Sequence, residues 1–143
     1  MSSNIHRALA FALALFAAAA SAQPALNDAD AAAIKAVITE QIDAFKRDDG
    51  AAAFSLAAPG IRAKFGSHEV FMQMVRDAYP AVYRPDWIYF EPPEVIDDMV
   101  LQPVRLTDAD GRAWIALYPM ERQPDGVWRI NGCQLARLQG RET

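Results

Sequence analysis

The spacing of apolar residues along this chain of 143 residues changes near Pro80 from the period of a helix to the period of a strand. Before this point, "NDADAAAIKAVITEQIDAFKRDDG" has apolar residues at i, i+3, i+4 and i+7, which predicts an amphipathic helix over residues 27–50. Asn27 can cap this helix and Gly50 can close it. The residues expected on its buried face are Ile34, Val37, Ile38, Gln41, Ile42 and Phe45.

Two shorter helices are expected between Gly50 and Pro80. The first is "GAAAFSLAAP", which Pro59 and Gly60 should stop. The second is "HEVFMQMVRDAY", which Ser67 can cap and Pro80 should end. The side chains expected to point inward from this second helix are Val70, Phe71, Met74, Val75 and Ala78.

The part of the chain after Pro80 is expected to form an antiparallel sheet. Prolines interrupt its first aromatic segment, so a strand at about residues 86–90 should lie at a sheet edge. Three more strands are expected between residues 99 and 138, and the turns "DADG" and "QPDG" between them predict two consecutive hairpins. The sequence therefore predicts an α+β fold, in which N-terminal helices pack on a curled antiparallel sheet.

The middle strand, at residues 113–120, is apolar on both of its faces. Its residues are Ala113, Ile115 and Leu117 on one face, and Trp114, Ala116, Tyr118 and Met120 on the other. A sheet with one solvated face would alternate apolar and polar residues, so this strand should be covered on both sides. The helices should cover one side, and a second subunit, a ligand or the far wall of the curled sheet should cover the other.

The last strand contains the only cysteine of the chain, within "DGVWRINGCQLARL". Strict alternation would put Cys133 on the face opposite Trp128 and Ile130. An extra residue at Asn131-Gly132, as in a β-bulge, would instead unite the apolar side chains in one stripe. That stripe would consist of Trp128, Ile130, Cys133 and Leu135. We therefore expect Cys133 to fill space at a bend of the sheet, with no lowered thiol pKa.

Residues 1–22 have the pattern of a secretory signal peptide. His6 and Arg7 precede an apolar run, and small residues follow it up to Ala22. The run is too short to span a bilayer, so we expect cleavage after Ala22 and no stable membrane insertion. Residues 23–143 should then form a single periplasmic or secreted domain. The chain has 18 acidic and 14 basic residues, and this negative balance argues against binding to nucleic acid.

Three segments of the chain resemble an uncharacterised family of exported bacterial domains: "FGSHEVFMQMV", "YPAVYRP" and "DGVWRINGCQL". The resemblance extends from about Asp28 to Leu138. It implies the cone-shaped fold of the nuclear-transport-factor-two-like superfamily, a cystatin-like cone shared with ketosteroid isomerase and polyketide-cyclase-like domains. The family implies no established activity, although enzymes of the superfamily generally project an acidic base into the cone.

No metal and no cofactor are expected. His68 and Cys133 are the only soft metal ligands after residue 22, and the seven glycines form neither a phosphate-binding loop nor a dinucleotide fingerprint. The segment "FGSHE" lacks the glycine spacing of a nucleophile elbow. A catalytic Cys-His pair is also disfavoured, because His68 would lie in the first turn of a helix, where the dipole destabilises imidazolium.

An isomerase- or cyclase-like enzyme with an acidic base is one alternative function. A carboxylate in an apolar pocket has a raised pKa and can take a proton from carbon near neutral pH. The expected strands at residues 112–120 and 127–138 contain no Asp or Glu, which leaves Asp43 or Asp86 as the base. Further acidic residues near the strands are Glu91, Asp97 and Asp98. Carboxylates are usually solvent-exposed, so each of these residues also suits the protein surface.

The aromatic and arginine residues favour a non-enzymatic binding domain. Wide apolar walls with a few fixed donors are typical of ligand pockets, and guanidinium groups suit a carboxylate or phosphate. We expect a small amphiphilic or aromatic ligand between the long helix and the sheet, in a site lined by Tyr83, Arg84, Trp114, Tyr118 and Arg129. The other alternative is a protein-interaction module of the bacterial envelope that forms a homodimer through its sheet face. Aromatics at strand spacing also suit an ordinary sheet core.

Overall fold

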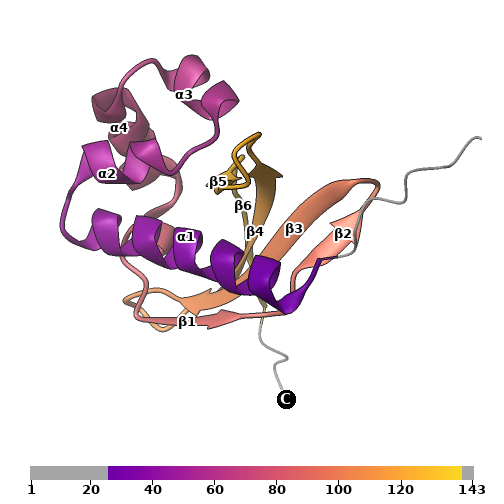
Figure 1. Ribbon diagram of the computed structural model, residues 1–143. Helices are drawn as coiled ribbons and strands as arrows, with labels where there is room; N and C mark the ends of the chain where they lie inside the picture. Colours follow the sequence, from indigo (N-terminus) through magenta and orange to yellow (C-terminus); the bar gives the residue numbers. More distant parts are fainter. Residues whose placement is uncertain (1–25, 140–143) are drawn as a thin grey trace, which may run out of the picture.

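Helices precede strands throughout residues 26–139, the part of the chain that the computed structural model describes (Figure 1). This order confirms the expected α+β fold with an antiparallel sheet. The helices are α1 (Asp28–Lys46), α2 (Gly50–Ser55), α3 (Pro59–Phe65), α4 (His68–Ala78) and α5 (Pro80–Tyr83). The strands are β1 (Trp87–Phe90), β2 (Glu94–Ile96), β3 (Met99–Thr107), β4 (Ala113–Arg122), β5 (Trp128–Ile130) and β6 (Gln134–Arg137). The predicted signal peptide lies outside the described residues.

Helix α1 begins where the sequence predicted and ends earlier. The Asn27 side chain accepts a hydrogen bond from the Asp30 amide, and the Asp30 carboxylate accepts one from the Asn27 amide, so a full capping box starts the helix. The helix ends at Lys46, and Asp48 takes a left-handed conformation with φ 56°. The expectation that Gly50 closes this helix was wrong, because Asp48 makes the turn and Gly50 starts α2.

Two prolines follow the ends of helices, as expected, and each of them also begins a new helix. Pro59 is the first residue of α3, and Pro80 is the first residue of α5. A proline suits this position because its missing N–H would have no partner in the first turn anyway. Helix α3 was therefore missed by the sequence analysis, and the chain does not pass directly from α4 into the sheet.

Helix α4 has its cap where expected, and Phe71 and Val75 are buried as predicted, but the rest of its buried face differs. Ser67 accepts a hydrogen bond from the Val70 amide at 3.3 Å. The Val70 side chain is 54 % exposed, whereas Met72 is buried. The inward orientation predicted for Val70 was wrong because Met72 packs toward α2, where a Cβ added to Gly50 would lie 2.8 Å from Met72 Cγ.

The sheet is antiparallel throughout the described residues. Its main path runs β1-β3-β4-β5, with β2 paired to β3 and β6 paired to β4, so β1 lies at an edge as predicted. Strand β2 and its hairpin to β3 were not predicted from the sequence. Asp97 and Asp98 form that turn with φ values of 48° and 63°, the left-handed conformations typical of a two-residue type I′ hairpin.

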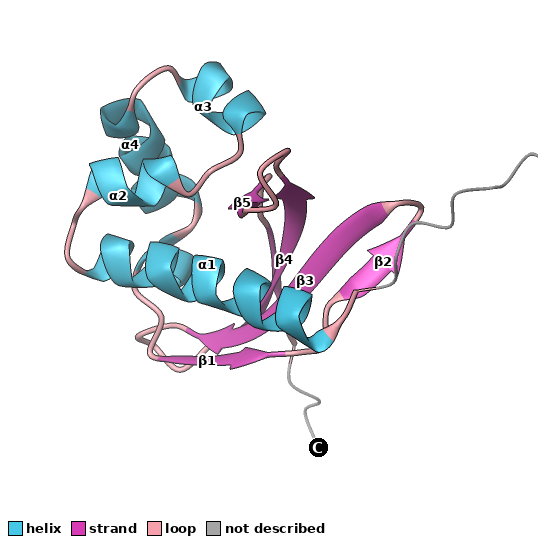
Figure 2. Cartoon of the chain, in the orientation of Figure 1, coloured by secondary structure: helices cyan, strands magenta, loops and turns pink. Residues whose placement is uncertain are grey.

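The predicted bulge in the last strand is present and separates β5 from β6. On β4, only Tyr118 and Pro119 lie between the residues paired with Gln134 and Ile130, while three residues of the partner segment span the same interval. Pro119 has no N–H to donate there, and its carbonyl accepts a bond from the Asn131 amide. Pro103 of β3 lies opposite a similar three-residue break between β1 and β2. The two breaks accompany the curl of the sheet (Figure 2).

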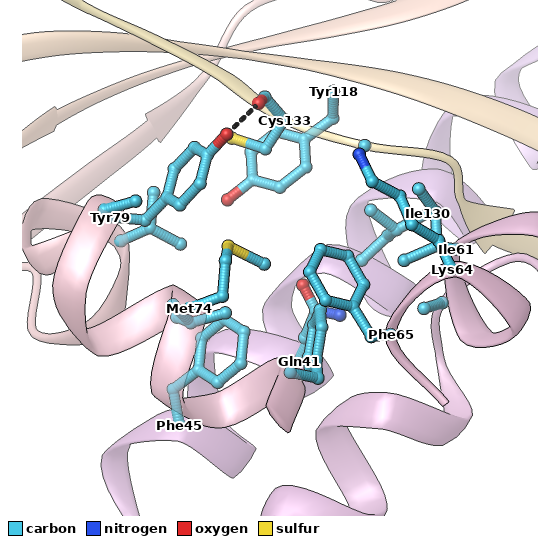
Figure 3. Close-up of a pocket in the computed structure, with 16 residues that line it drawn as sticks. Gln41, Phe45, Ile61, Lys64, Phe65, Met74, Tyr79, Tyr118, Ile130 and Cys133 are labelled. Atoms are coloured by element: carbon cyan, nitrogen blue, oxygen red, sulfur yellow. Dashed lines mark hydrogen bonds between the residues drawn. The ribbon is translucent and has the colours of Figure 1, made fainter. Parts of the chain in front are cut away.

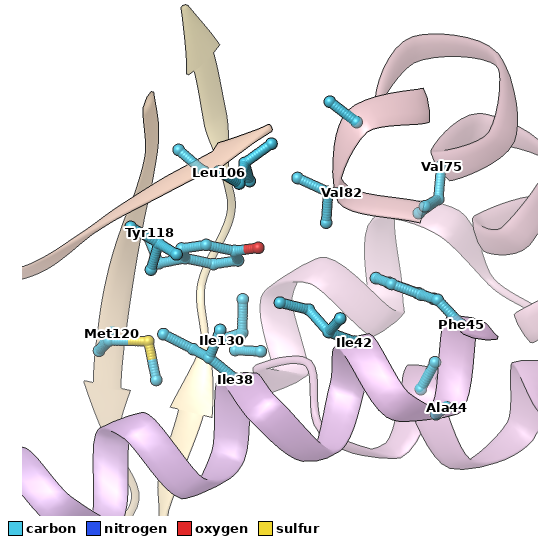
Figure 4. Packing of buried hydrophobic residues seen from close by; sticks show 14 of the residues in the cluster. Ile38, Ile42, Ala44, Phe45, Val75, Val82, Leu106, Tyr118, Met120 and Ile130 are labelled. Carbon is cyan, nitrogen blue, oxygen red and sulfur yellow. The ribbon is translucent and has the colours of Figure 1, made fainter. Parts of the chain in front are cut away.

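The helices cover one face of the curled sheet, and the core lies between them. Ala116, Tyr118 and Met120 of β4 are buried there with Ile38 and Ile42 of α1 (Figure 4). The predicted stripe is confirmed, because Cys133 and Leu135 pack against the same cluster as Trp128 and Ile130. The opposite face of β4 is only half-buried in the single chain. Among residues 26–139, no helix has the length and apolar character needed to cross a membrane.

Candidate functional site

A cavity of about 470 Å³ lies between the helices and the end of the sheet where β5 and β6 diverge (Figure 3). Helices α1, α3 and α4 form its walls on one side, and β4 with the bulge forms the other. Its lining is largely apolar and aromatic, as in many small-molecule sites. The lining residues with polar side-chain atoms are Gln41, Lys64, Tyr79, Tyr118 and Cys133.

Tyr118 contributes an unusual polar atom to this cavity. Its side chain projects from β4 toward the helices, and the residue is 1 % exposed. The hydroxyl is fully buried and has no hydrogen-bond partner among the described residues. The Cys133 thiol is nearby, but sulfur is a weak acceptor and the pair does not reach hydrogen-bond geometry. Burial raises the pKa of Tyr118 well above its usual value, so the hydroxyl is a neutral donor.

Cys133 lies at the edge of the same cavity as a neutral thiol. Burial raises its pKa from 9.0 to about 12, in the direction opposite to that of a reactive cysteine. Its backbone carbonyl accepts a 2.9 Å hydrogen bond from the Tyr79 hydroxyl. Burial also raises the pKa of Tyr79. The sequence-based view of Cys133 as a filler without a lowered pKa is therefore confirmed.

The other polar groups of the cavity are an amide and an ammonium. Gln41 is buried on α1, and its Nε2 donates a 3.1 Å hydrogen bond to the Ala53 carbonyl. Lys64 belongs to α3, a helix with no buried residue, and it is solvent-exposed with Nζ 5.6 Å from the centre of the Phe65 ring. Lys64 therefore supplies a positive charge at the cavity's outer side. The lining includes no Asp or Glu among the described residues.

Of the five residues expected to line a site, Tyr118 belongs to this cavity and the other four lie outside its lining. Tyr83 and Arg84 both bind the Asp48 carboxylate instead, and the hydrogen bond from the Tyr83 hydroxyl is the larger cause of a lowered Asp48 pKa. Arg84 Nη1 also donates to the Phe45 carbonyl at 2.5 Å. The hydrogen bonds of these two residues therefore connect the end of α5 to the end of α1.

Trp114 and Arg129 are engaged elsewhere on the sheet. Trp114 Nε1 donates a 3.0 Å hydrogen bond to Asp108, and this bond lowers the pKa of the carboxyl. Arg129 is paired across the strands with Glu121, on the face opposite the cavity, and its Nη1 donates to the Trp128 carbonyl. Neither residue is among those that line the cavity.

The acidic residues considered as a catalytic base also lie away from the cavity. Asp43 is exposed on α1, and Asp86 is exposed before β1. His68 is absent from the lining as well and pairs with Glu69 at 3.2 Å. In the described part of the chain, no three His, Cys, Asp or Glu side chains come together as metal ligands would.

The sequence predicted a site beside the long helix but not the part of the cavity wall that α3 forms. Ile61, Lys64 and Phe65 come from α3, which the sequence analysis did not predict. Met74 and Tyr79 were assigned to a helix but not to a site. The apolar spacing of "PGIRAKF" after an N1 proline was the available signal.

The family model for a domain of unknown function, DUF4864, matches residues 27–143. The chain belongs to this family. The DUF4864 match spans every described helix and strand, so the cavity is part of the DUF4864 domain itself. Neither the curated proteins nor the solved structures that were compared include a match to the chain.

Proposed function

We propose that this DUF4864 domain is a non-enzymatic module that binds a small amphiphilic or aromatic molecule in the cavity between α1, α3, α4 and the sheet. The observation that carries the proposal is the buried Tyr118 hydroxyl, which has no partner among the described residues and belongs to a side chain that lines a largely apolar cavity of about 470 Å³. Buried polar groups are nearly always hydrogen-bonded, so such an exception calls for a functional explanation.

The polar groups of the cavity support binding more than catalysis. The described lining offers neutral donors and one exposed ammonium but no carboxylate that could act as a base. We also propose that the fold belongs to the nuclear-transport-factor-two-like superfamily, which the packing of helices on a curled antiparallel sheet supports. The signal-peptide pattern of residues 1–22 supports a role for the domain after export.

Native mass spectrometry of protein purified from its own cell envelope tests the binding function. We expect the wild-type domain to retain a small molecule. The Ala78→Phe variant should lose that added mass, because Ala78 lines the cavity and a phenyl ring there would occupy its volume. Ala33→Phe is the matched control, since Ala33 is exposed on α1 and does not line the cavity. A wild-type protein without added mass, and without affinity for apolar probes, would contradict the proposal.

A second candidate function is homodimerisation through the outer face of the sheet, and one observation favours it. Trp87 and Tyr89 are 53 % and 51 % exposed, and their rings stack in parallel with centroids 6.0 Å apart. On the same face, Arg105 Nε lies 2.7 Å from Glu91 Oε1. A two-fold interface pairs one patch with its own copy, and a patch with charges of both signs suits such pairing.

The occupant of this outer face would be a second copy of the chain. Light scattering of the purified domain tests this candidate. We expect a dimer that Trp87→Glu converts to a monomer, because the variant replaces an exposed apolar ring, opposite the neutral Thr107, by a carboxylate that the contact would remove from water. Lys35→Glu, on the helical side of the fold, is the control and should leave the dimer intact. A wild-type monomer at high concentration would exclude this function.

A further inference from the structure

The Tyr118 hydroxyl can donate a hydrogen bond but has no acceptor among the described residues. It lies at the inner wall of the cavity, within the cluster that contains Ile42, Val82 and Leu106 (Figure 4). None of these three side chains offers a hydrogen-bonding atom. A ligand oxygen at Tyr118 would therefore meet one hydroxyl donor, with the weakly polar Cys133 thiol beside it and apolar side chains around both.

The distribution of charge decides which kind of oxygen fits there. Lys64 is the only charged residue in the described lining, and it is exposed on α3, at the outer side. A carboxylate or phosphate oxygen at Tyr118 would be removed from water without a cation to balance it, which is strongly unfavourable. A carbonyl, ether or hydroxyl oxygen carries no such penalty.

The hydrogen bonds of the neighbouring polar side chains do not involve the Tyr118 hydroxyl. The Tyr79 hydroxyl already donates to the Cys133 carbonyl, and Gln41 Nε2 already donates to the Ala53 carbonyl. The raised pKa values of Tyr118 and Cys133 agree with a neutral interior. Of the two tyrosine hydroxyls in the described lining, Tyr118 is therefore the one without a hydrogen-bond partner.

We infer that the cavity selects molecules with an uncharged oxygen acceptor and binds them with this acceptor against Tyr118 and the rest of the molecule toward α3. The inference rests on the proposed ligand-binding function and specifies its ligand class. An acidic group on such a ligand would lie at the opposite end, beside Lys64, where solvent and the ammonium can stabilise it.

Three naphthalene probes of similar size test the inference by equilibrium dialysis against the full domain. 2-Acetylnaphthalene has a neutral acceptor, 2-isopropylnaphthalene has the same shape without one, and 2-naphthoate is an anion. We expect 2-acetylnaphthalene to bind roughly tenfold more tightly than 2-isopropylnaphthalene, the size of effect expected from one buried hydrogen bond. 2-Naphthoate should bind more weakly than 2-acetylnaphthalene.

The Tyr118→Phe variant should abolish this preference, so that 2-acetylnaphthalene no longer binds more tightly than 2-isopropylnaphthalene, because its carbonyl would be buried without a donor. The variant removes only an oxygen without a protein partner, and thermal unfolding should confirm that it folds. Tyr89→Phe is the matched control, because it removes a tyrosine hydroxyl that is exposed on β1 and outside the cavity lining, and it should keep the preference of the wild type.

The outcomes separate the inference from the function on which it rests. Equal binding of both neutral probes to the wild type, or a preference that survives in Tyr118→Phe, overturns the inference and leaves the ligand-binding function standing. Tightest binding of 2-naphthoate also overturns it. Binding of none of the three probes removes the support for the cavity as a ligand site, and the inference falls with it.

Discussion

The Tyr79 hydroxyl donates a 2.9 Å hydrogen bond to the backbone carbonyl of Cys133, and so joins the end of α4 to the bulge between β5 and β6. The two residues are 54 positions apart in the chain. This bond closes one side of the cavity (Figure 3). It also gives the bulge, whose own backbone leaves the strand ladder, a fixed position relative to the helices.

The Tyr79→Phe variant should lower the free energy of unfolding by about 1 kcal/mol, the typical net value of a partly buried hydrogen bond. Denaturant unfolding should show a lower midpoint with an unchanged slope, because the surface exposed on unfolding stays the same. An unchanged midpoint would mean that water donates to the Cys133 carbonyl in place of the tyrosine hydroxyl, with no loss of unfolding free energy.

Native Cys133 should react slowly with thiol reagents at pH 8. Burial raises the pKa of its thiol to about 12, so the nucleophilic thiolate is rare at this pH. Labelling should become fast only when the protein is unfolded by denaturant. Cys133→Ala should leave ligand binding intact and cost at most ~2 kcal/mol of stability, since it removes one small buried group. Rapid labelling of the native protein would contradict this description of the site.

The stability of the domain should fall as the pH rises above 9. In the unfolded chain the Cys133 thiol ionises near pH 9.0, whereas in the folded chain its pKa is about 12. The folded state therefore holds the proton that the unfolded state loses, and stability that is fully present below pH 9 is lost between pH 9 and 12. Tyr118 and Tyr79 act in the same direction at higher pH.

Cys133→Ala provides the matching measurement for this alkaline loss. The decrease in unfolding free energy with pH should be less steep for the variant than for the wild type between pH 9 and 11. The difference should be at most ~1.4 kcal/mol per pH unit, the value for one proton. Equal slopes for the two proteins would show that the thiol is solvated in the folded state.

Gly132→Ala should destabilise the domain by roughly 1–3 kcal/mol, because residues with a side chain avoid this backbone region. Gly132 has φ 133°, while a Cβ there would come no closer than 3.5 Å to Pro119, so the expected cost is one of backbone conformation and not of a clash. Gly60→Ala is the control. A Cβ at Gly60, in the first turn of α3, meets nothing within 4 Å, and this change should be neutral or slightly stabilising.

The elements predicted well from the sequence are those determined by neighbouring residues. The caps at Asn27 and Ser67 depend on bonds to residues three positions away, and both are present. The bulge at Asn131-Gly132 followed from the need to keep Trp128, Ile130 and Cys133 on one face. Local rules were insufficient at Pro59 and Pro80, since a proline can follow one helix and start the next.

The site was harder to predict because contacts between residues far apart in the chain determine which side chains line it. Tyr83 and Arg84 have the chemistry of a ligand site, yet Asp48, some 35 positions earlier, binds both. Tyr118 was among the expected residues, but the sequence could not indicate that its hydroxyl lacks a partner. The contribution of α3 depends on a helix whose existence was not predicted.

The two prolines opposite the breaks in the sheet also affect how this protein can assemble. Pro103 lies opposite the break between β1 and β2, and Pro119 lies opposite the break between β5 and β6, so each edge of the sheet consists of two separate strands. These four edge strands are only three or four residues long. Each piece presents few consecutive unpaired amides and carbonyls, so a foreign strand finds no long edge on which to extend the ladder. A chain this rich in apolar strand sequence is thereby protected against edge-to-edge aggregation by the same interruptions that curl its sheet.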